Sequence, residues 1–253
     1  MTISPKEAVR YGWETYKKRP WFFSGVFFLL FLLSIRFGYQ ANVSSADPGE
    51  VLVVLLFGLL LTAIQILARM GKTNLVLRAH ENVEKLSIRD IWKPHPFWRF
   101  VGGTILQGLI TLGPAALIGL IWMVMILSSA SVGTPVSILG LLFIAGIIWA
   151  IIAGIRLMFV NYLIIDKGLG PIEALRESVH ITQGHMFDLF VFCVALFGIN
   201  LLAVLPFFLF ISMINIFAVL FLVLLLVSVP VSLFAVVYVY RQFEHKRRTH
   251  TSA

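Results

Sequence analysis

The chain has 253 residues, of which 59% are hydrophobic and only 13% are charged, and its mean hydropathy is +0.95. Because a soluble domain is roughly 45–50% apolar, this composition excludes a soluble globular protein and predicts an all-α bundle of membrane helices. The net charge of +8 does not indicate nucleic-acid binding, because the Lys and Arg residues fall in the gaps between apolar runs.

Residues 4–18 are predicted to form a helix that lies in the membrane interface. Ser4 is a candidate N-cap, Pro5 would occupy the first helical position, and Glu7 follows the cap by three residues. Apolar positions then recur at helical spacing against charged ones, which is typical of an interfacial helix.

Six apolar runs follow that are long enough to cross a bilayer, for which about 20 residues are needed. The sequence predicts a single membrane domain over residues 1–253, closed by a basic tail at 241–253. The predicted spans are 21–40, 51–70, 98–127, 137–160, 187–206 and 214–238.

The distribution of positive charge predicts the orientation of these spans. All but two of the 20 Lys and Arg residues, Arg36 and Arg156, lie before the first span, at 69–99, at 161–184 or in the tail. The other three gaps contain none. By the positive-inside rule, both termini are expected in the cytoplasm, where the basic residues would face anionic lipid headgroups.

A second interfacial helix is predicted at 171–184, where Pro171 would begin the helix and Gly184 would end it. One side carries an apolar stripe, and the other is a candidate interaction surface for a partner or a gate. The alternative is a connector helix that only covers the inner end of the bundle. The polar side consists of Glu173, Arg176, Glu177 and His180.

These two helices also suggest an internal repeat. Residues 5–10 align with 171–176 at a constant offset, which places Gly12 over Ser178, and a shorter candidate helix lies at 86–92. Three units of one surface helix and two spans would explain this pattern. The alternative is that amphipathic surface helices converge on similar residues.

Several polar side chains lie within or at the ends of the spans. Arg156 could extend to the headgroups, pair with Asp166 or Asp188, or contact a substrate or lipid. The amides would form hydrogen bonds between helices or line a cavity. The candidate intramembrane polar site consists of Gln65, Gln107, Arg156, Asn161 and Asn200.

The sequence contains no pattern that predicts catalysis. The six histidines lack metal-ligand spacing, and Cys193 is the only cysteine, so the chain cannot form an internal disulfide or a multi-cysteine metal site. Neither a nucleophile elbow nor a phosphate-binding loop is present. We therefore expect no enzymatic activity, no metal and no cofactor.

Four stretches resemble a bacterial family of six-span integral membrane proteins with no established activity. They read RLMFVNYLIID (156–166), PIEALRES (171–178), TQG (182–184) and YVYRQ (238–242). That family is similar to the membrane domain attached to some glycerophosphodiester phosphodiesterases. One departure is the sequence LGPAA at 112–116, where relatives often carry a Leu-Ile-Pro-Gly-like break. The resemblance implies a bacterial plasma-membrane protein, and no phosphodiesterase domain is present.

The leading functional hypothesis is a non-enzymatic scaffold or interaction module at the inner face of the plasma membrane. Its partners would be anionic lipid headgroups and a membrane or cytoplasmic protein, and not nucleic acid. The alternative is a transporter or export component for a lipid or small amphiphile, which requires a cavity lined by the intramembrane polar residues.

Overall fold

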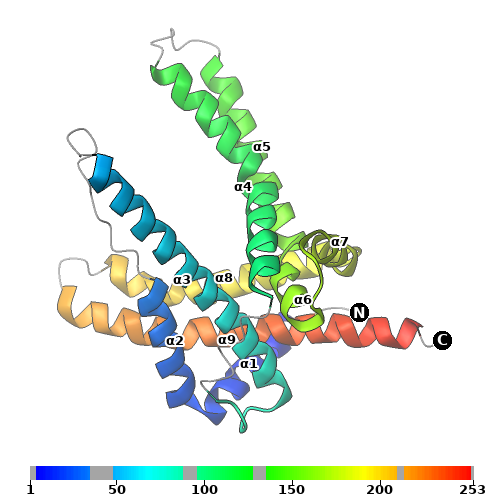
Figure 1. Cartoon of the computed structure of the whole chain (residues 1–253). Helices are drawn as coiled ribbons and strands as arrows, with labels where there is room; N and C mark the ends of the chain where they lie inside the picture. The colour runs from blue at the N-terminus through cyan, green and yellow to red at the C-terminus, as the bar shows by residue number, and fades with distance from the viewer. Residues whose placement is uncertain (1–3, 35–47, 88–95, 128–134, 210–213, 252–253) are drawn as a thin grey trace. The chain divides into compact units, whose positions relative to one another are not determined.

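The structure is a computed structural model that describes residues 4–34, 48–87, 96–127, 135–209 and 214–251 (Figure 1). These residues contain helices and no strand, which confirms the predicted all-α class. The helices of this described part are α1 (Pro5–Lys18), α2 (Pro20–Ser34), α3 (Pro48–Glu81), α4 (Phe97–Leu127), α5 (Pro135–Arg156), α6 (Val160–Lys167), α7 (Pro171–Thr182), α8 (Met186–Leu209) and α9 (Ile214–Thr251).

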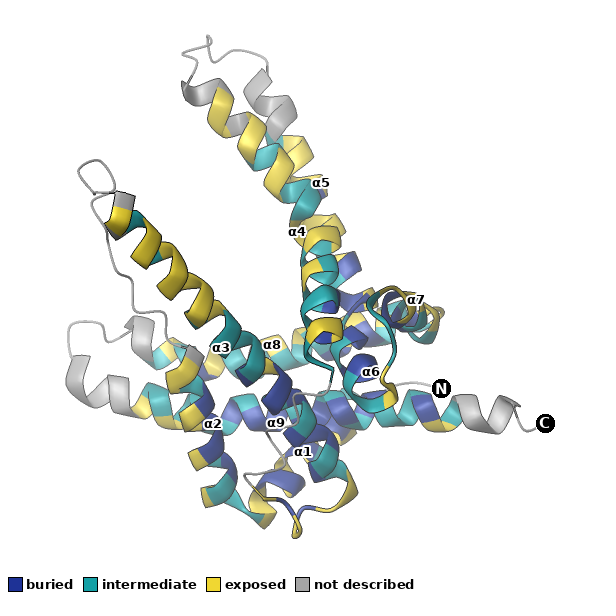
Figure 2. Ribbon diagram, viewed as in Figure 1, coloured by how far each residue is buried: buried dark blue, intermediate teal, exposed yellow. Residues whose placement is uncertain are grey.

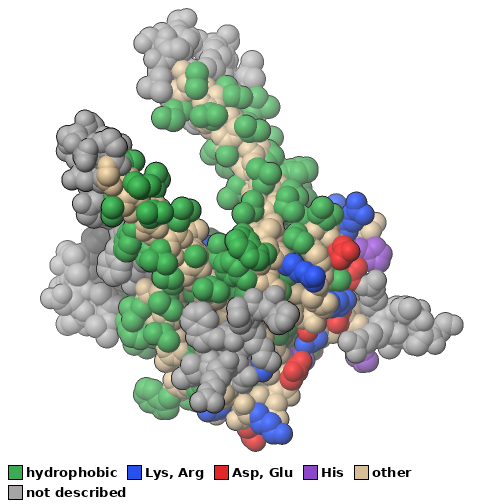
Figure 3. All heavy atoms as spheres, in the orientation of Figure 1, with side chains coloured by type: hydrophobic (Ala, Val, Ile, Leu, Met, Phe, Trp, Pro, Cys, Tyr) green, Lys and Arg blue, Asp and Glu red, His purple; other side chains and the backbone are tan. Residues whose placement is uncertain are grey.

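Five of these helices are long and apolar enough to cross a membrane, so the chain is a multi-pass membrane protein. The apolar segments are Val51–Glu81, Phe97–Ile121, Gly140–Lys167, Met186–Pro206 and Leu220–Lys246. Many large apolar side chains of α3, α4 and α5 are exposed, as lipid-facing residues would be (Figures 2 and 3).

The first predicted span, 21–40, corresponds to α2, which has only 15 residues. Residues 35–47, which include the rest of that span, lie outside the described part of the chain. The count of six spans therefore stays a prediction. At the other end, the predicted basic tail continues α9 as helix to Thr251.

The chain divides into two compact units, and each is described by itself. Unit 1 consists of Met1–Phe97 and Val194–Ala253, and unit 2 consists of Trp98–Cys193. Helix α8 contributes its first residues to unit 2 and the remainder to unit 1.

In unit 1, α1 packs closely along α9 (Figure 1). Ala8 is fully buried in this contact, and Gly12 lies so near α9 that a Cβ atom there would overlap the carbonyl oxygen of Val231. The Phe23 ring of α2 meets Phe234 edge-on, with ring centroids 4.8 Å apart. The small residues Ala8 and Gly12 thus permit the backbones of α1 and α9 to approach closely.

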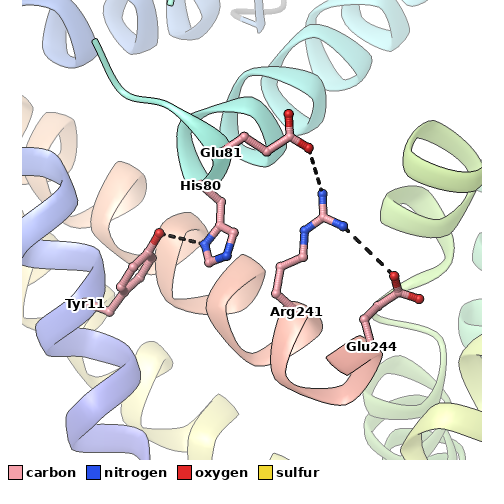
Figure 4. Close-up of polar contacts among 5 residues, drawn as sticks. All are labelled: Tyr11, His80, Glu81, Arg241 and Glu244. Carbon is pink, nitrogen blue, oxygen red and sulfur yellow. Dashed lines mark hydrogen bonds and ion pairs between the residues drawn. The ribbon is translucent and has the colours of Figure 1, made fainter. Parts of the chain in front are cut away.

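A polar junction also joins α1, α3 and α9 (Figure 4). The Tyr11 hydroxyl and His80 Nδ1 form a hydrogen bond of 2.6 Å, and burial raises the pKa of Tyr11, so its phenol is protonated at neutral pH. Arg241 lies 3.3 Å from the carboxylate of Glu81 and 4.0 Å from that of Glu244. These contacts connect the end of α3 to α9.

In unit 2, small residues allow α4 to lie close to parts of α5 and α6. A Cβ atom at Gly146 would lie 3.3 Å from the Cα atom of Ala115, and Gly103 of α4 adjoins Ile164 of α6. Such small residues are typical of helix interfaces in membranes, where packing must stabilise association without water.

Helices α1 and α7 occupy the two stretches predicted as surface helices, and α1 begins after its predicted cap. The Ser4 hydroxyl accepts a hydrogen bond from the Glu7 amide (3.4 Å), and Gly184 has a left-handed φ of +81°, just beyond the end of α7. Their location in a membrane interface stays a prediction.

The proposed repeat also stays a prediction, although the aligned helices bury equivalent positions. Ala8 and Gly12 of α1 are buried, as are Ala174 and Ser178 of α7. The third candidate helix, 86–92, lies largely outside the described residues.

Candidate functional site

A groove of about 530 Å³ lies within unit 2, between α4, α5 and α7. Its floor is apolar and its polar groups are few, which is the usual character of a ligand pocket. The apolar lining consists of Ile110, Trp149, Ile152, Ala153, Leu157, Leu175 and Val179, and the polar lining consists of Arg156, Arg176, His180 and Gln183.

The helical period explains which side chains reach this groove. On α5, Trp149, Ile152 and Arg156 are separated by three and four residues, so they lie on one face. On α7, Arg176, His180 and the following Gln183 share a face for the same reason. The groove is therefore formed where two helix faces meet, each of which carries an arginine.

Trp149 has a second role, in the wall of the groove. Pro114 lies within α4 and has no amide hydrogen, so the carbonyl of Ile110, four residues earlier, lacks its helical donor. The indole nitrogen of Trp149 donates a hydrogen bond of 2.9 Å to this carbonyl. A tryptophan of α5 thus satisfies the backbone group that the proline leaves unpaired.

The position of Arg156 depends on the end of α5. The helix stops there because the Val160 amide bonds to the carbonyl of Leu157 (3.2 Å) and not to that of Arg156. The buried hydroxyl of Ser178, on α7, donates instead to the Arg156 carbonyl at 2.7 Å. Ser178 thereby caps α5 and joins it to α7, which carries the other cation of the groove.

Two predicted site residues stabilise the same break in the helix. Gln107 Nε2 donates to the Leu157 carbonyl (3.1 Å), and Asn161 Nδ2 lies 3.4 Å from Gln107 Oε1. The Thr104 hydroxyl donates to Asn161 Oδ1 at 3.4 Å and extends this chain of hydrogen bonds. In this structure the amides of Gln107 and Asn161 therefore form contacts between helices.

Substitution of Ser178 by alanine is expected to lower the free energy of unfolding by about 1–3 kcal/mol, because the Arg156 carbonyl would lose its buried donor. Thermal unfolding in detergent and hydrogen exchange in α6 and α7 would measure this. Thr62→Ala is the control, because the Thr62 hydroxyl donates to the Gly58 carbonyl of its own helix (2.8 Å) and so stabilises no contact between helices through this bond. Equal stability of the two variants would contradict the capping role.

The four residues of the predicted interaction helix divide into two pairs. Glu173 accepts a hydrogen bond from the Gly170 amide (3.1 Å) at the start of α7, and Glu177 lies 3.5 Å from the ammonium of Lys167. Arg176 and His180 line the groove instead. The acidic pair thus stabilises the helix, and the basic pair faces the candidate site.

The charge of the groove follows from this division. Its described lining includes two arginines and no Asp or Glu. Asp188, a predicted partner of Arg156, lies 3.8 Å from His185, and the pairing of Arg156 with Asp166 stays a prediction. Exposed cations beside an apolar floor suit a molecule with one anionic end and one apolar end.

The remaining predicted residues lie in unit 1. Gln65 is half-buried in α3. Asn200 of α8 bonds to Ser232 (2.9 Å) and to Ser228 (3.3 Å), both on α9. These contacts connect α8 and α9, as expected for polar groups between membrane helices.

Sequence reasoning missed Trp149 and Gln183. The spacing of seven residues between Trp149 and Arg156 places both on one helix face and could have identified the tryptophan. Gln183 lies one turn beyond the predicted polar face of α7, and nothing in the sequence distinguishes it. Within the described part of the chain, no three His, Cys, Asp or Glu side chains lie close enough to hold a metal ion.

Comparison of the chain with protein-family models, with curated proteins and with solved structures gave no match.

Proposed function

We propose that this multi-pass membrane protein is a non-enzymatic interaction module that binds an anionic amphiphile in the groove between α4, α5 and α7. The anionic headgroup would lie between Arg156 and Arg176, and the apolar part would lie along Trp149 and Ile152. The observation that carries the proposal is a pair of arginines from two different helices beside an apolar floor, with no Asp or Glu among the described lining residues.

The depth of Arg156 supports a membrane lipid as the ligand. From Pro135 to Arg156, α5 extends for about 32 Å, at 1.5 Å per residue, which is close to the ~30 Å thickness of a bilayer core. A guanidinium at this end of the helix would lie at the level of lipid phosphates. Arg can bond two phosphate oxygens at once, so the pair would favour a phosphate-bearing lipid.

The distribution of basic residues supports an inner-face location for this groove. By the positive-inside rule, we propose that both termini are cytoplasmic, and that the protein lies in the bacterial plasma membrane that the family resemblance implies. A lipid held against α7 would then present a surface to a protein partner, which is the scaffold role that we propose.

A transporter is the weaker proposal. It requires the amides of Gln107 and Asn161 to line a solute cavity, whereas in the structure both bond to neighbouring helices. The lipid-binding scaffold needs no such rearrangement.

Thermal unfolding in a neutral detergent tests the proposed function. Phosphatidylglycerol at about 100 times its Kd is expected to raise the free energy of unfolding by about 2.7 kcal/mol, and phosphatidylethanolamine to raise it less. Val179→Trp fills the apolar floor but keeps every cation, so it should diminish the difference between the lipids. Equal shifts for both lipids, or a difference that is undiminished in Val179→Trp, would contradict the proposal.

A further inference from the structure

A second groove, in unit 1, combines apolar walls with two cations. It has a volume of about 220 Å³ and lies between α2, α3 and α9. Its described lining consists of Phe27, Leu30, Phe31, Ala68, Arg69, Lys72, Leu225, Leu226 and Val229, and includes no Asp or Glu.

The two cations lie together on α3. Arg69 and Lys72 are three residues apart, so their side chains emerge from the same face of the helix, and both line the groove. Like charges at this spacing destabilise a helix unless a counter-charge lies nearby. No Asp or Glu is among the described lining residues, so an anion from outside the chain would supply this counter-charge.

The level of Arg69 along α3 indicates where that anion would come from. Arg69 lies about 27 Å along the helix from Val51, at 1.5 Å per residue, so a span that starts at Val51 would place it near the lipid phosphates. The aromatic and aliphatic walls from α2 and α9 would accompany acyl chains at the same depth.

The sequence around Arg69 repeats that around Arg156. Arg69 and Asn74 have the same separation as Arg156 and Asn161, and each asparagine is followed by three buried residues, 75–77 and 162–164. Each arginine thus lies at the same distance from the start of its helix and lines an apolar groove. The second cation differs, since α3 supplies Lys72 itself, whereas in unit 2 Arg176 comes from α7.

We propose that the groove of unit 1 binds a membrane lipid with a terminal phosphate group. A phosphate monoester carries a charge of about −1.5 to −2 at neutral pH and can neutralise both Arg69 and Lys72, whereas a phosphodiester carries a single charge. The site is independent of the groove in unit 2, because the two share no residue.

Native mass spectrometry of the full chain in detergent, with phosphatidic acid or phosphatidylglycerol as the probe, tests this site. The combined substitution Arg69→Gln and Lys72→Gln is expected to lower phosphatidic acid affinity about tenfold or more at one site. Arg69→Lys with Lys72→Arg should retain the affinity for phosphatidic acid, because both positive charges are kept. In Arg156→Gln with Arg176→Gln, the site in unit 1 should still bind, so failure of the proposal for unit 2 would be seen separately.

Labelling of the unmodified protein provides a second readout that needs no variant. Phosphatidic acid should slow the reaction of Lys72 with an amine-reactive reagent, and phosphatidylglycerol should slow it much less. Unchanged phosphatidic acid binding in the double glutamine variant would overturn the proposal. Equal protection of Lys72 by the two lipids would overturn the preference for a terminal phosphate.

Discussion

Replacement of both Arg156 and Arg176 by glutamine is expected to weaken the binding of phosphatidylglycerol about 100-fold. Each arginine would lose a charge-assisted contact with the lipid phosphate, and such contacts contribute about 1.5 kcal/mol or more, or roughly tenfold in Kd. Because the apolar floor is unchanged, the variant should still bind uncharged amphiphiles. Titration by native mass spectrometry would measure the Kd of each lipid.

Lys17→Gln with Lys18→Gln is the matched control for this variant. Both lysines are exposed at the end of α1, in unit 1, so their removal lowers the net charge equally without touching the groove. The affinity of this control variant for phosphatidylglycerol should stay within about twofold of that of the unaltered protein, since exposed charges contribute little to a specific contact. A similar loss in both variants would mean that general surface charge, and not the groove, attracts the lipid.

Gly12→Ala is expected to destabilise the protein by separating α1 from α9. The added Cβ atom would overlap the carbonyl oxygen of Val231 and come within 3.3 Å of the Ala235 amide nitrogen. Both neighbours are backbone atoms of α9, so relief requires α1 to move away from α9. Overpacking of this kind costs about 1–3 kcal/mol, measurable by unfolding in a graded mixture of denaturing and mild detergents.

Gly25→Ala is the control for that experiment. A Cβ atom at Gly25 of α2 meets nothing within 4 Å, and alanine favours helix over glycine by up to about 1 kcal/mol. This variant should be as stable as the unaltered protein or slightly more stable. If Gly12→Ala behaves in the same way, α1 does not pack on α9 as described.

The sequence predicts the helices of this protein well because their signals are local. A cap such as Ser4 or a first-turn proline such as Pro171 acts on residues three or four positions away, and composition alone identifies an apolar span. The end of α7 is less exactly predicted, since the chain is already extended at Gln183, one residue before the left-handed Gly184. The all-α class and the presence of helices at Pro5–Lys18 and Pro171–Thr182 follow from such signals.

The groove could be predicted only in parts. The sequence identifies Arg156 as a charge within a span, and Arg176 and His180 as part of a polar helix face. No local signal indicates that Arg156 lies close to the other two residues. The three residues meet because α5 ends at Arg156, where the Ser178 hydroxyl of α7 donates a hydrogen bond to the Arg156 carbonyl. Likewise, the role of Trp149 requires the unpaired carbonyl of Ile110, a consequence of Pro114 on the neighbouring helix.

Crosslinking from inside the groove tests lipid binding most directly. A photoreactive benzoylphenylalanine in place of the exposed lining residue Gln183, activated in membranes of mixed phosphatidylglycerol and phosphatidylethanolamine, would label the lipid that occupies the site without filling the apolar floor. We expect adducts enriched in phosphatidylglycerol relative to the bulk membrane, and loss of this enrichment when Arg156 and Arg176 are glutamine. Adducts with the bulk composition, or enrichment that survives the loss of both arginines, would contradict an anionic lipid site between α5 and α7.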